Sequence, residues 1–189
     1  FLINALHDFK REYPGVRIKI HNHTTPEIMK NLISGRLDLA VITAPFLMPK
    51  TVSGVNVMSF QEILVGGTQF RELGGSPMEL EEIKKYPWIG VGTGSATYEL
   101  YKNFFIDHKI DVEPDMEVAT SDLLIPLIKS NLGIGFVPEK MAMPLVEEGK
   151  LVQIPLRSSI PERSIQIVSD KGRARSLAAD TFYRFLKSR

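Results

Sequence analysis

Apolar residues recur at two spacings near the start of the chain, which predicts a helix followed by a strand. Apolar side chains at Leu2, Leu6 and Phe9 recur at the spacing of one helix face, and the turn at residues 13–15 ends this helix. Residues 16–20 then alternate apolar and basic side chains, the pattern of a half-buried strand. The chain therefore opens with a helix that is followed directly by a strand.

A second helix and strand follow. Thr24 supplies a hydroxyl cap, Pro26 lies in the first turn, and Glu27 stands three residues after the cap, which together are typical of a helix start. Gly35 ends this helix. Residues 37–42 form an almost continuous apolar run, as in a parallel strand that is covered on both faces.

The same alternation of strands and helices continues to the end of the chain, which predicts an α/β fold with mainly parallel sheets. Pro126 falls inside one predicted helix and is expected to kink it. The predicted strands are 62–65, 88–91, 116–118, 132–137, 151–156 and 164–168; the predicted helices are 79–86, 98–105, 121–128 and 177–186.

Two segments have the composition of linkers and predict two domains. Residues 66–77 are rich in glycine, and residues 157–162 read Arg-Ser-Ser-Ile-Pro-Glu. We expect a discontinuous subdomain I of residues 1–66 plus 162–189 and a subdomain II of residues 67–161. A cleft between the two would be the ligand site.

Composition excludes several classes of protein. The chain has 189 residues, and its 23 Lys and Arg against 22 Asp and Glu give a net charge of +1, which disfavours a free-standing nucleic-acid binder. The absence of cysteine excludes disulfides, thiolate metal sites and cysteine nucleophiles. No apolar run approaches the roughly 20 residues that span a bilayer. Because the chain opens on Phe1 inside a helical pattern, we expect the natural protein to begin earlier.

Hydroxyl side chains gather where predicted strands lead into helices. Helix N-termini carry free backbone N–H groups and partial positive charge, so several of them together would suit a carboxylate or another small anion. Ser and Thr are also ordinary helix caps, so each residue alone has a purely structural explanation. The candidate ligand contacts are Thr24, Thr25, Thr43, Gly94, Ser95, Thr97 and Ser121.

Other chemistry finds little support in the sequence. The glycine-rich turn at residues 90–97 fails the dinucleotide fingerprint because Ser95 stands where glycine is required, and it also fails the esterase elbow. His21 and His23 are better explained as solvated residues than as metal ligands. We therefore predict no catalytic residues, no metal, no cofactor and no enzymatic activity.

Four segments resemble the effector-binding domain of LysR-type transcriptional regulators. They are residues 9–16, which contain Tyr-Pro-Gly-Val; residues 32–40, which contain Gly-Arg-Leu-Asp-Leu-Ala; residues 132–138; and residues 149–152. The resemblance covers nearly the whole chain. This sequence departs from the family in lacking the strand and turn before the opening helix, and in having Asn131 where the family often has glycine. Asparagine tolerates the left-handed conformation that such a position needs.

The resemblance implies two Rossmann-like subdomains joined by two crossover strands, as in type 2 periplasmic binding proteins, with a small-molecule effector bound between them. It assigns effector contact to the candidate residues named above. It also implies a cytoplasmic homodimer, a tetramer at full length, with no membrane partner and with DNA bound only by an N-terminal winged helix-turn-helix outside this chain. The alternative is a solute-binding protein of an ABC-type transporter, which shares the architecture.

Overall fold

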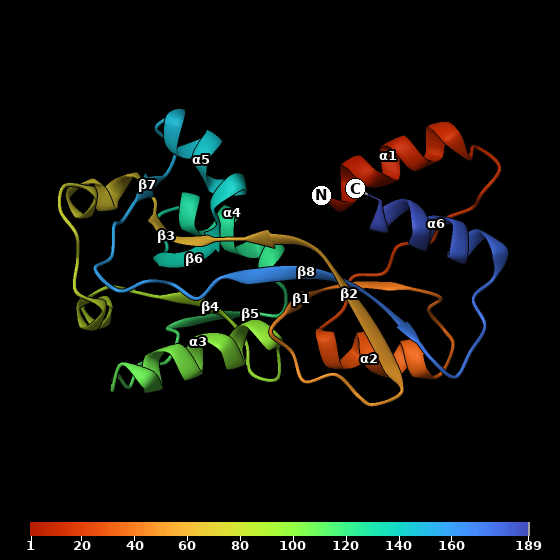
Figure 1. Ribbon diagram of the computed structural model, residues 1–189. Helices are drawn as coiled ribbons and strands as arrows, with labels where there is room; N and C mark the ends of the chain where they lie inside the picture. The colour runs from red at the N-terminus through yellow and green to blue at the C-terminus, as the bar shows by residue number, and fades with distance from the viewer. Residues whose placement is uncertain (189) are drawn as a thin grey trace. The chain divides into compact units, whose positions relative to one another are not determined.

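The computed structural model describes residues 1–188 and divides into two compact units. Unit 1 is formed by residues 1–59 together with the chain from Ser164 onward, and unit 2 by Phe60–Arg163. The chain therefore passes between the units twice. Both units combine helices and strands, which confirms the predicted α/β class (Figure 1).

Unit 1 has a three-stranded sheet with helices packed against it. The strands are β1 (Ala40–Ala44), β2 (Val52–Phe60) and β8 (Arg163–Asp170), in the order β1-β8-β2, and β1 runs antiparallel to β8. The helix α2 (Thr25–Ile33) packs on β1, while α1 (Leu2–Glu12) lies beside α6 (Leu177–Lys187) (Figure 1). Phe9 is fully buried, with its ring 4.7 Å from that of Phe182, so these aromatic side chains join α1 to α6.

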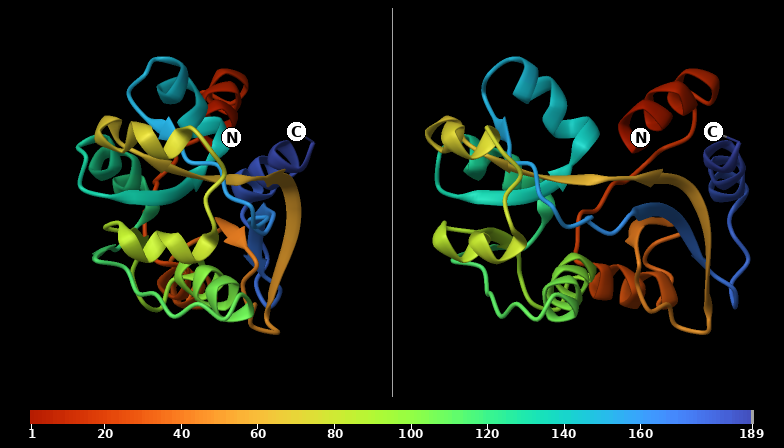
Figure 2. Two further views of the ribbon diagram at one scale, coloured as in Figure 1. Left: turned by 90° about the vertical axis from the view of Figure 1, so that its left-hand side faces the viewer. Right: turned by 60° about the vertical axis from the view of Figure 1, so that its left-hand side comes forward.

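Unit 2 contains two small sheets. The first has the order β6-β3-β7 and is antiparallel, and the second is the parallel pair β4-β5. Helix α3 packs along β4, and α4 and α5 pack along β3 and β6 (Figure 1, Figure 2). The bounds are β3 Glu62–Gly66, β4 Ile89–Val91, α3 Ala96–Asp107, β5 Met116–Val118, α4 Leu124–Lys129, β6 Ile134–Pro138, α5 Glu139–Glu147 and β7 Val152–Gln153.

An aromatic cluster fills much of the core of unit 2. The ring of Trp88 lies 5.0 Å from that of Phe105, and Tyr101 stacks on Phe136 at 4.3 Å. All four side chains are buried. Because aromatic side chains bury more surface than any others, this cluster fixes α3 against the sheet.

Several predicted elements differ from the observed ones. Residues 16–20 form no strand, because the Lys10 ammonium donates to the carbonyls of Pro14 and Val16, each at 2.8 Å, and binds this segment to the end of α1. The predicted strand at 37–42 begins only at Ala40. Its first residues remain in the turn after α2, where the Leu37 amide donates to the Asn31 carbonyl. Most strand pairs whose register is known are antiparallel, contrary to the expected parallel sheets.

The region between the first two strands of unit 2 is more ordered than a linker. Thr68–Gly74 and Leu80–Lys85 are short 3-10 helices, the second replacing the α-helix predicted at 79–86. The predicted helix at 121–128 is a 3-10 turn, Ser121–Leu123, followed by α4. Pro126 is thus the third residue of α4, in the first turn, where backbone amides have no acceptor within the helix.

Asn131 has the left-handed conformation that its place after a helix predicts. Its φ is +63°, and its side chain accepts a 3.0 Å hydrogen bond from the Gln69 amide. Asparagine is among the few residues other than glycine that adopt this conformation readily. The substitution of asparagine for glycine therefore leaves the local fold intact.

Candidate functional site

The glycine-rich turn between β4 and α3 leads directly into the N-terminus of α3. Gly94 has φ +80°, which an L side chain adopts only with strain, and the chain then enters α3 at Ser95. The Ser95 hydroxyl oxygen accepts a 3.0 Å hydrogen bond from the Tyr98 amide and so caps the helix. The earlier amides of the first turn, at Ala96 and Thr97, have no acceptor within the helix.

Ser121 is placed at the same edge of unit 2. Strands β4 and β5 are parallel, with Val91 opposite Val118, and the Gly92 amide donates to the Val118 carbonyl at 2.8 Å. The segments that follow the two strands, which carry Ser95 and Ser121, therefore leave the sheet at neighbouring points. The carboxyl ends of parallel strands are the usual location of ligand sites in α/β folds.

A buried cluster that the sequence did not reveal lies beside this turn. We call Glu62, Thr97, Tyr101 and Arg163 the Arg163 cluster. Arg163 Nη1 donates to Glu62 Oε1 at 2.9 Å, Arg163 Nη2 donates to Thr97 Oγ1 at 3.0 Å, and the Tyr101 hydroxyl donates to Glu62 Oε2. Glu62, Tyr101 and Arg163 are each at most 5% exposed.

Burial and charge control the ionisation of this cluster. The pKa of Tyr101 is raised well above its ordinary value, first because the phenol is buried and second because the Glu62 carboxylate lies beside it. The phenol therefore remains a hydrogen-bond donor at neutral pH. Glu62 and Arg163 are 101 positions apart, so no sequence motif could join them.

The other predicted contacts lie in unit 1. Thr24 caps α2, and both its amide and its hydroxyl donate to Glu27 Oε2, at 3.1 and 2.9 Å. These bonds lower the pKa of Glu27. Thr25 is the first residue of α2, and Thr43 lies near the carboxyl end of β1, opposite Ile165. Glu27 thus places a carboxylate at the N-terminus of α2, and Glu117 places one at the turn before α3, where its Oε2 accepts from the Thr93 amide at 3.4 Å.

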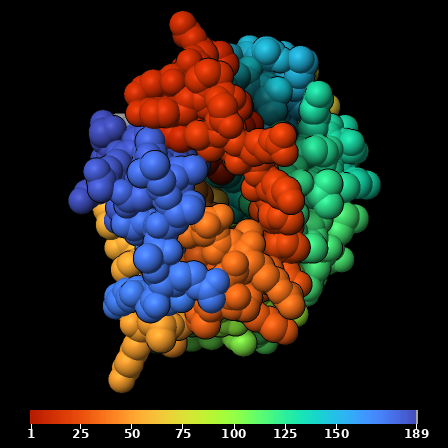
Figure 3. Space-filling view, turned by 90° about the vertical axis from the view of Figure 1, so that its right-hand side faces the viewer, coloured from red at the N-terminus to blue at the C-terminus, as the bar shows by residue number. Residues whose placement is uncertain are grey.

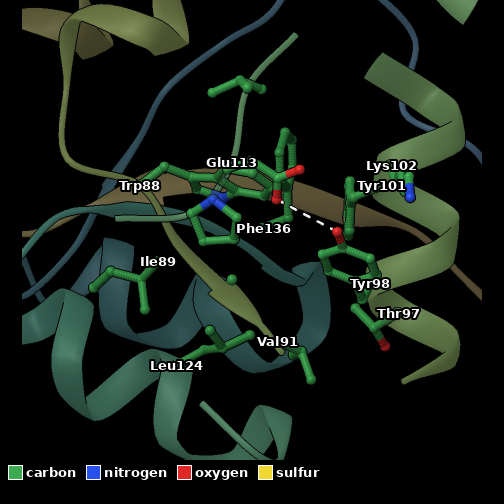
Figure 4. Close-up of a pocket in the computed structure, with 13 residues that line it drawn as sticks. Trp88, Ile89, Val91, Thr97, Tyr98, Tyr101, Lys102, Glu113, Leu124 and Phe136 are labelled. Carbon is green, nitrogen blue, oxygen red and sulfur yellow. Dashed lines mark hydrogen bonds between the residues drawn. The ribbon is translucent and has the colours of Figure 1, made fainter. Parts of the chain in front are cut away.

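An aromatic pocket beside α3 is too small to be the main ligand site. It is lined by Trp88, Tyr98, Tyr101 and Phe136 among others, and its volume is about 20 Å³, room for about one water molecule. Figure 4 shows the Tyr98 hydroxyl bonded to the Glu113 carboxylate across its mouth, at 3.4 Å, and the Thr97 hydroxyl turned away from its aromatic residues. Thr97 thus lines this pocket without directing its hydroxyl at the aromatic rings.

A larger hollow lies in unit 1, away from the predicted contacts. It has a volume of about 350 Å³ and is bounded by residues 16–21, residues 36–39 and the start of α6. Figure 3 shows this face hollowed between α1 in red and α6 in blue. None of the seven predicted contacts is among its lining residues. Among residues 1–188, no helix is both long and apolar enough to cross a membrane.

Curated proteins that are similar to this chain are described as transcriptional regulators. It is 22% identical over 190 residues to the HTH-type transcriptional activator CmpR of Synechocystis sp., covering 98% of this chain and 61% of that protein. It is 26% identical over 183 residues to a probable RuBisCO transcriptional regulator of Gracilaria tenuistipitata var. liui, covering 92% and 58%. The chain thus spans about three-fifths of the length of these relatives.

Solved structures share the fold at low sequence identity. The Synechocystis PCC6803 CcmR regulatory domain in complex with 2-PG has a TM-score of 0.84 and 17% identity, over 100% of this chain and 90% of that one. The effector binding domain of QuiR in complex with shikimate has a TM-score of 0.82 and 15% identity, over 99% and 88%. The family model for the LysR substrate binding domain matches residues 1–189. This chain therefore belongs to the LysR substrate-binding domain family.

Proposed function

We propose that this chain is the effector-sensing domain of a LysR-type transcriptional regulator and binds a small carboxylate or another small anion. The observation that carries the proposal is the N-terminus of α3. There Gly94 opens the backbone, Ser95 caps the helix, and the Thr97 hydroxyl is held by a buried arginine. A helix N-terminus flanked by hydroxyl groups favours a ligand that carries negative charge.

The remaining predicted contacts complete the proposed site. Thr24, Thr25 and Thr43 from unit 1 are proposed to meet the ligand together with Ser121 from unit 2. On this proposal subdomain I of the family corresponds to residues 1–66 plus 162–189, and subdomain II to residues 67–161. A ligand changes the equilibrium between two arrangements only by its difference in affinity for them.

The proposed partners follow from the family. The solved CcmR and QuiR domains are complexes with 2-PG and with shikimate, respectively. The curated relatives are HTH-type and other transcriptional regulators that are longer than this chain. We infer a cytoplasmic homodimer, with the opening helix of one copy on subdomain II of the other, a tetramer at full length, and DNA binding by a separate N-terminal domain. The proposed role is regulatory and not enzymatic.

A thermal-shift screen tests the proposal. The purified chain is heated with acetate, glycolate, benzoate, shikimate, phosphate and sulfate, and the Ser95→Ala and Thr25→Ala variants are heated in parallel. A ligand at 100 times its dissociation constant adds about 2.7 kcal/mol of stability, which is readily measured. The proposal predicts that at least one anion stabilises the wild type and that both variants respond less. A hit to which both variants respond fully would place the site elsewhere.

A further inference from the structure

The Arg163 cluster fixes the direction of a hydrogen bond at the proposed site. A guanidinium group carries only donors, so the Thr97 oxygen must be the acceptor in its 3.0 Å bond with Arg163 Nη2. The Thr97 hydroxyl hydrogen therefore points to another acceptor. The Ser95 oxygen is likewise an acceptor from the Tyr98 amide, which leaves its hydrogen to donate.

The arginine is itself held in one position. Glu62 Oε1 accepts from Arg163 Nη1, and Glu62 Oε2 accepts from the Tyr101 hydroxyl, so the carboxylate binds one donor on each oxygen. The guanidinium also lies over the Phe60 ring, 5.5 Å from its centroid. Glu62 balances the positive charge of Arg163, so the ion pair as a whole adds no net charge. The ion pair would therefore act on a ligand by orienting the Thr97 hydroxyl and not by adding charge.

We propose that Arg163 is a positioning residue that presets the Thr97 hydroxyl as a hydrogen-bond donor. Together with the Ser95 hydroxyl and the first amides of α3, it forms a set in which donors predominate. Such a set favours a ligand group that only accepts hydrogen bonds, such as a carboxylate, over the matching amide, which has one acceptor oxygen instead of two. This inference rests on the proposed function, because it concerns the same site.

Two members of the Arg163 cluster lie near the ends of the segment that forms unit 2. Unit 2 begins at Phe60 and ends at Arg163, so Glu62 and Arg163 mark the two points where the chain enters and leaves the unit. A ligand that engages Thr97 therefore contacts a side chain that is bonded to Arg163 and, through Arg163, linked to Glu62. Through these bonds a bound ligand would act on β3, which carries Glu62, and on β8, which begins at Arg163.

A double variant separates positioning from stability. Glu62→Leu combined with Arg163→Met removes the ion pair without leaving a buried charge alone, so the chain is expected to fold. Arg157→Met is the matched control, because Arg157 is an exposed arginine of the same unit, paired with Glu79. Thr97→Val removes the hydroxyl itself while nearly keeping the shape of the side chain.

The test is isothermal titration with acid and amide pairs: acetate with acetamide, glycolate with glycolamide, and benzoate with benzamide. We expect the preference for acid over amide to fall by roughly tenfold or more in Thr97→Val and in the double variant, and to be unchanged in Arg157→Met. A double variant that retains both the wild-type affinity and the wild-type preference would overturn the proposal.

A second readout needs no ligand. Three-bond NMR couplings report the χ1 angle of Thr97, which we expect to be a single rotamer in the wild type and an average in the double variant. An unchanged single rotamer in the double variant would overturn the positioning role. If no anion binds the wild type, the proposed function fails, whereas the χ1 couplings still decide whether Arg163 orients Thr97.

Discussion

The buried ion pair between Glu62 and Arg163 gives a sharp prediction about stability. The nitrogen and oxygen are 2.9 Å apart, and the side chains are 4% and 3% exposed. At an effective dielectric constant of about 20, unit charges about 4 Å apart attract by about 4 kcal/mol, which is largely offset by the cost of removing them from water. Removing one partner forfeits this attraction and leaves the other charge buried.

We therefore expect Arg163→Met alone to lower the free energy of unfolding by about 3–5 kcal/mol. Glu62→Leu with Arg163→Met should cost less, about 1–3 kcal/mol, because it leaves no lone buried charge but removes the acceptor of the buried Tyr101 hydroxyl. Urea denaturation followed by tryptophan fluorescence measures both, because Trp88 is the only tryptophan and lies in the core of unit 2. A single variant that costs less than about 1 kcal/mol, or a double variant less stable than the single one, would refute this reasoning.

Three further predictions concern single side chains. The raised pKa of Tyr101 means that the folded protein holds the phenol proton more tightly than the unfolded chain does, so the free energy of unfolding should fall as pH rises above 10. Tyr101→Phe should reduce that fall, as measured by urea titrations at alkaline pH. Thr24→Ala removes the cap of α2 and should cost about 1 kcal/mol in urea denaturation at neutral pH; a cost near zero would contradict the capping role. Gly94→Ala should lower the free energy of unfolding by about 1–2 kcal/mol because the φ of Gly94 is positive, and it should weaken anion binding in titration calorimetry. The control Gly149→Ala, also at positive φ, should be destabilised to a similar extent but should bind the anion normally.

Local signals in the sequence predicted the elements whose cause is local. The capping box at Thr24 and Glu27, the left-handed turn at Asn131 and the cap at Ser95 all depend on residues a few positions apart, and the structure contains each of them. The alternation at residues 16–20 was misleading, because this segment forms no strand and its first carbonyl, that of Val16, accepts from the Lys10 side chain. A local pattern predicts an exposed face but not the partner of a strand.

The candidate site was predictable only in part for the same reason. Ser95 and Thr97 stand out because a glycine-rich turn precedes a helix. The arginine that orients Thr97 gave no such indication, since it lies 66 positions away and reaches Thr97 only through the folding of unit 2. Long-range polar contacts of this kind follow from tertiary packing, which a spacing rule does not contain.

The amide spectrum of the ¹⁵N-labelled chain, recorded during titration with the anion that stabilises it most, tests whether the N-terminus of α3 is the binding site. We predict the largest shifts at the amides of residues 94–98, with smaller shifts at Ser121 and around Thr24 and Thr43. Shifts confined to the hollow of unit 1 around Phe182, with residues 94–98 unmoved, would contradict the proposed site.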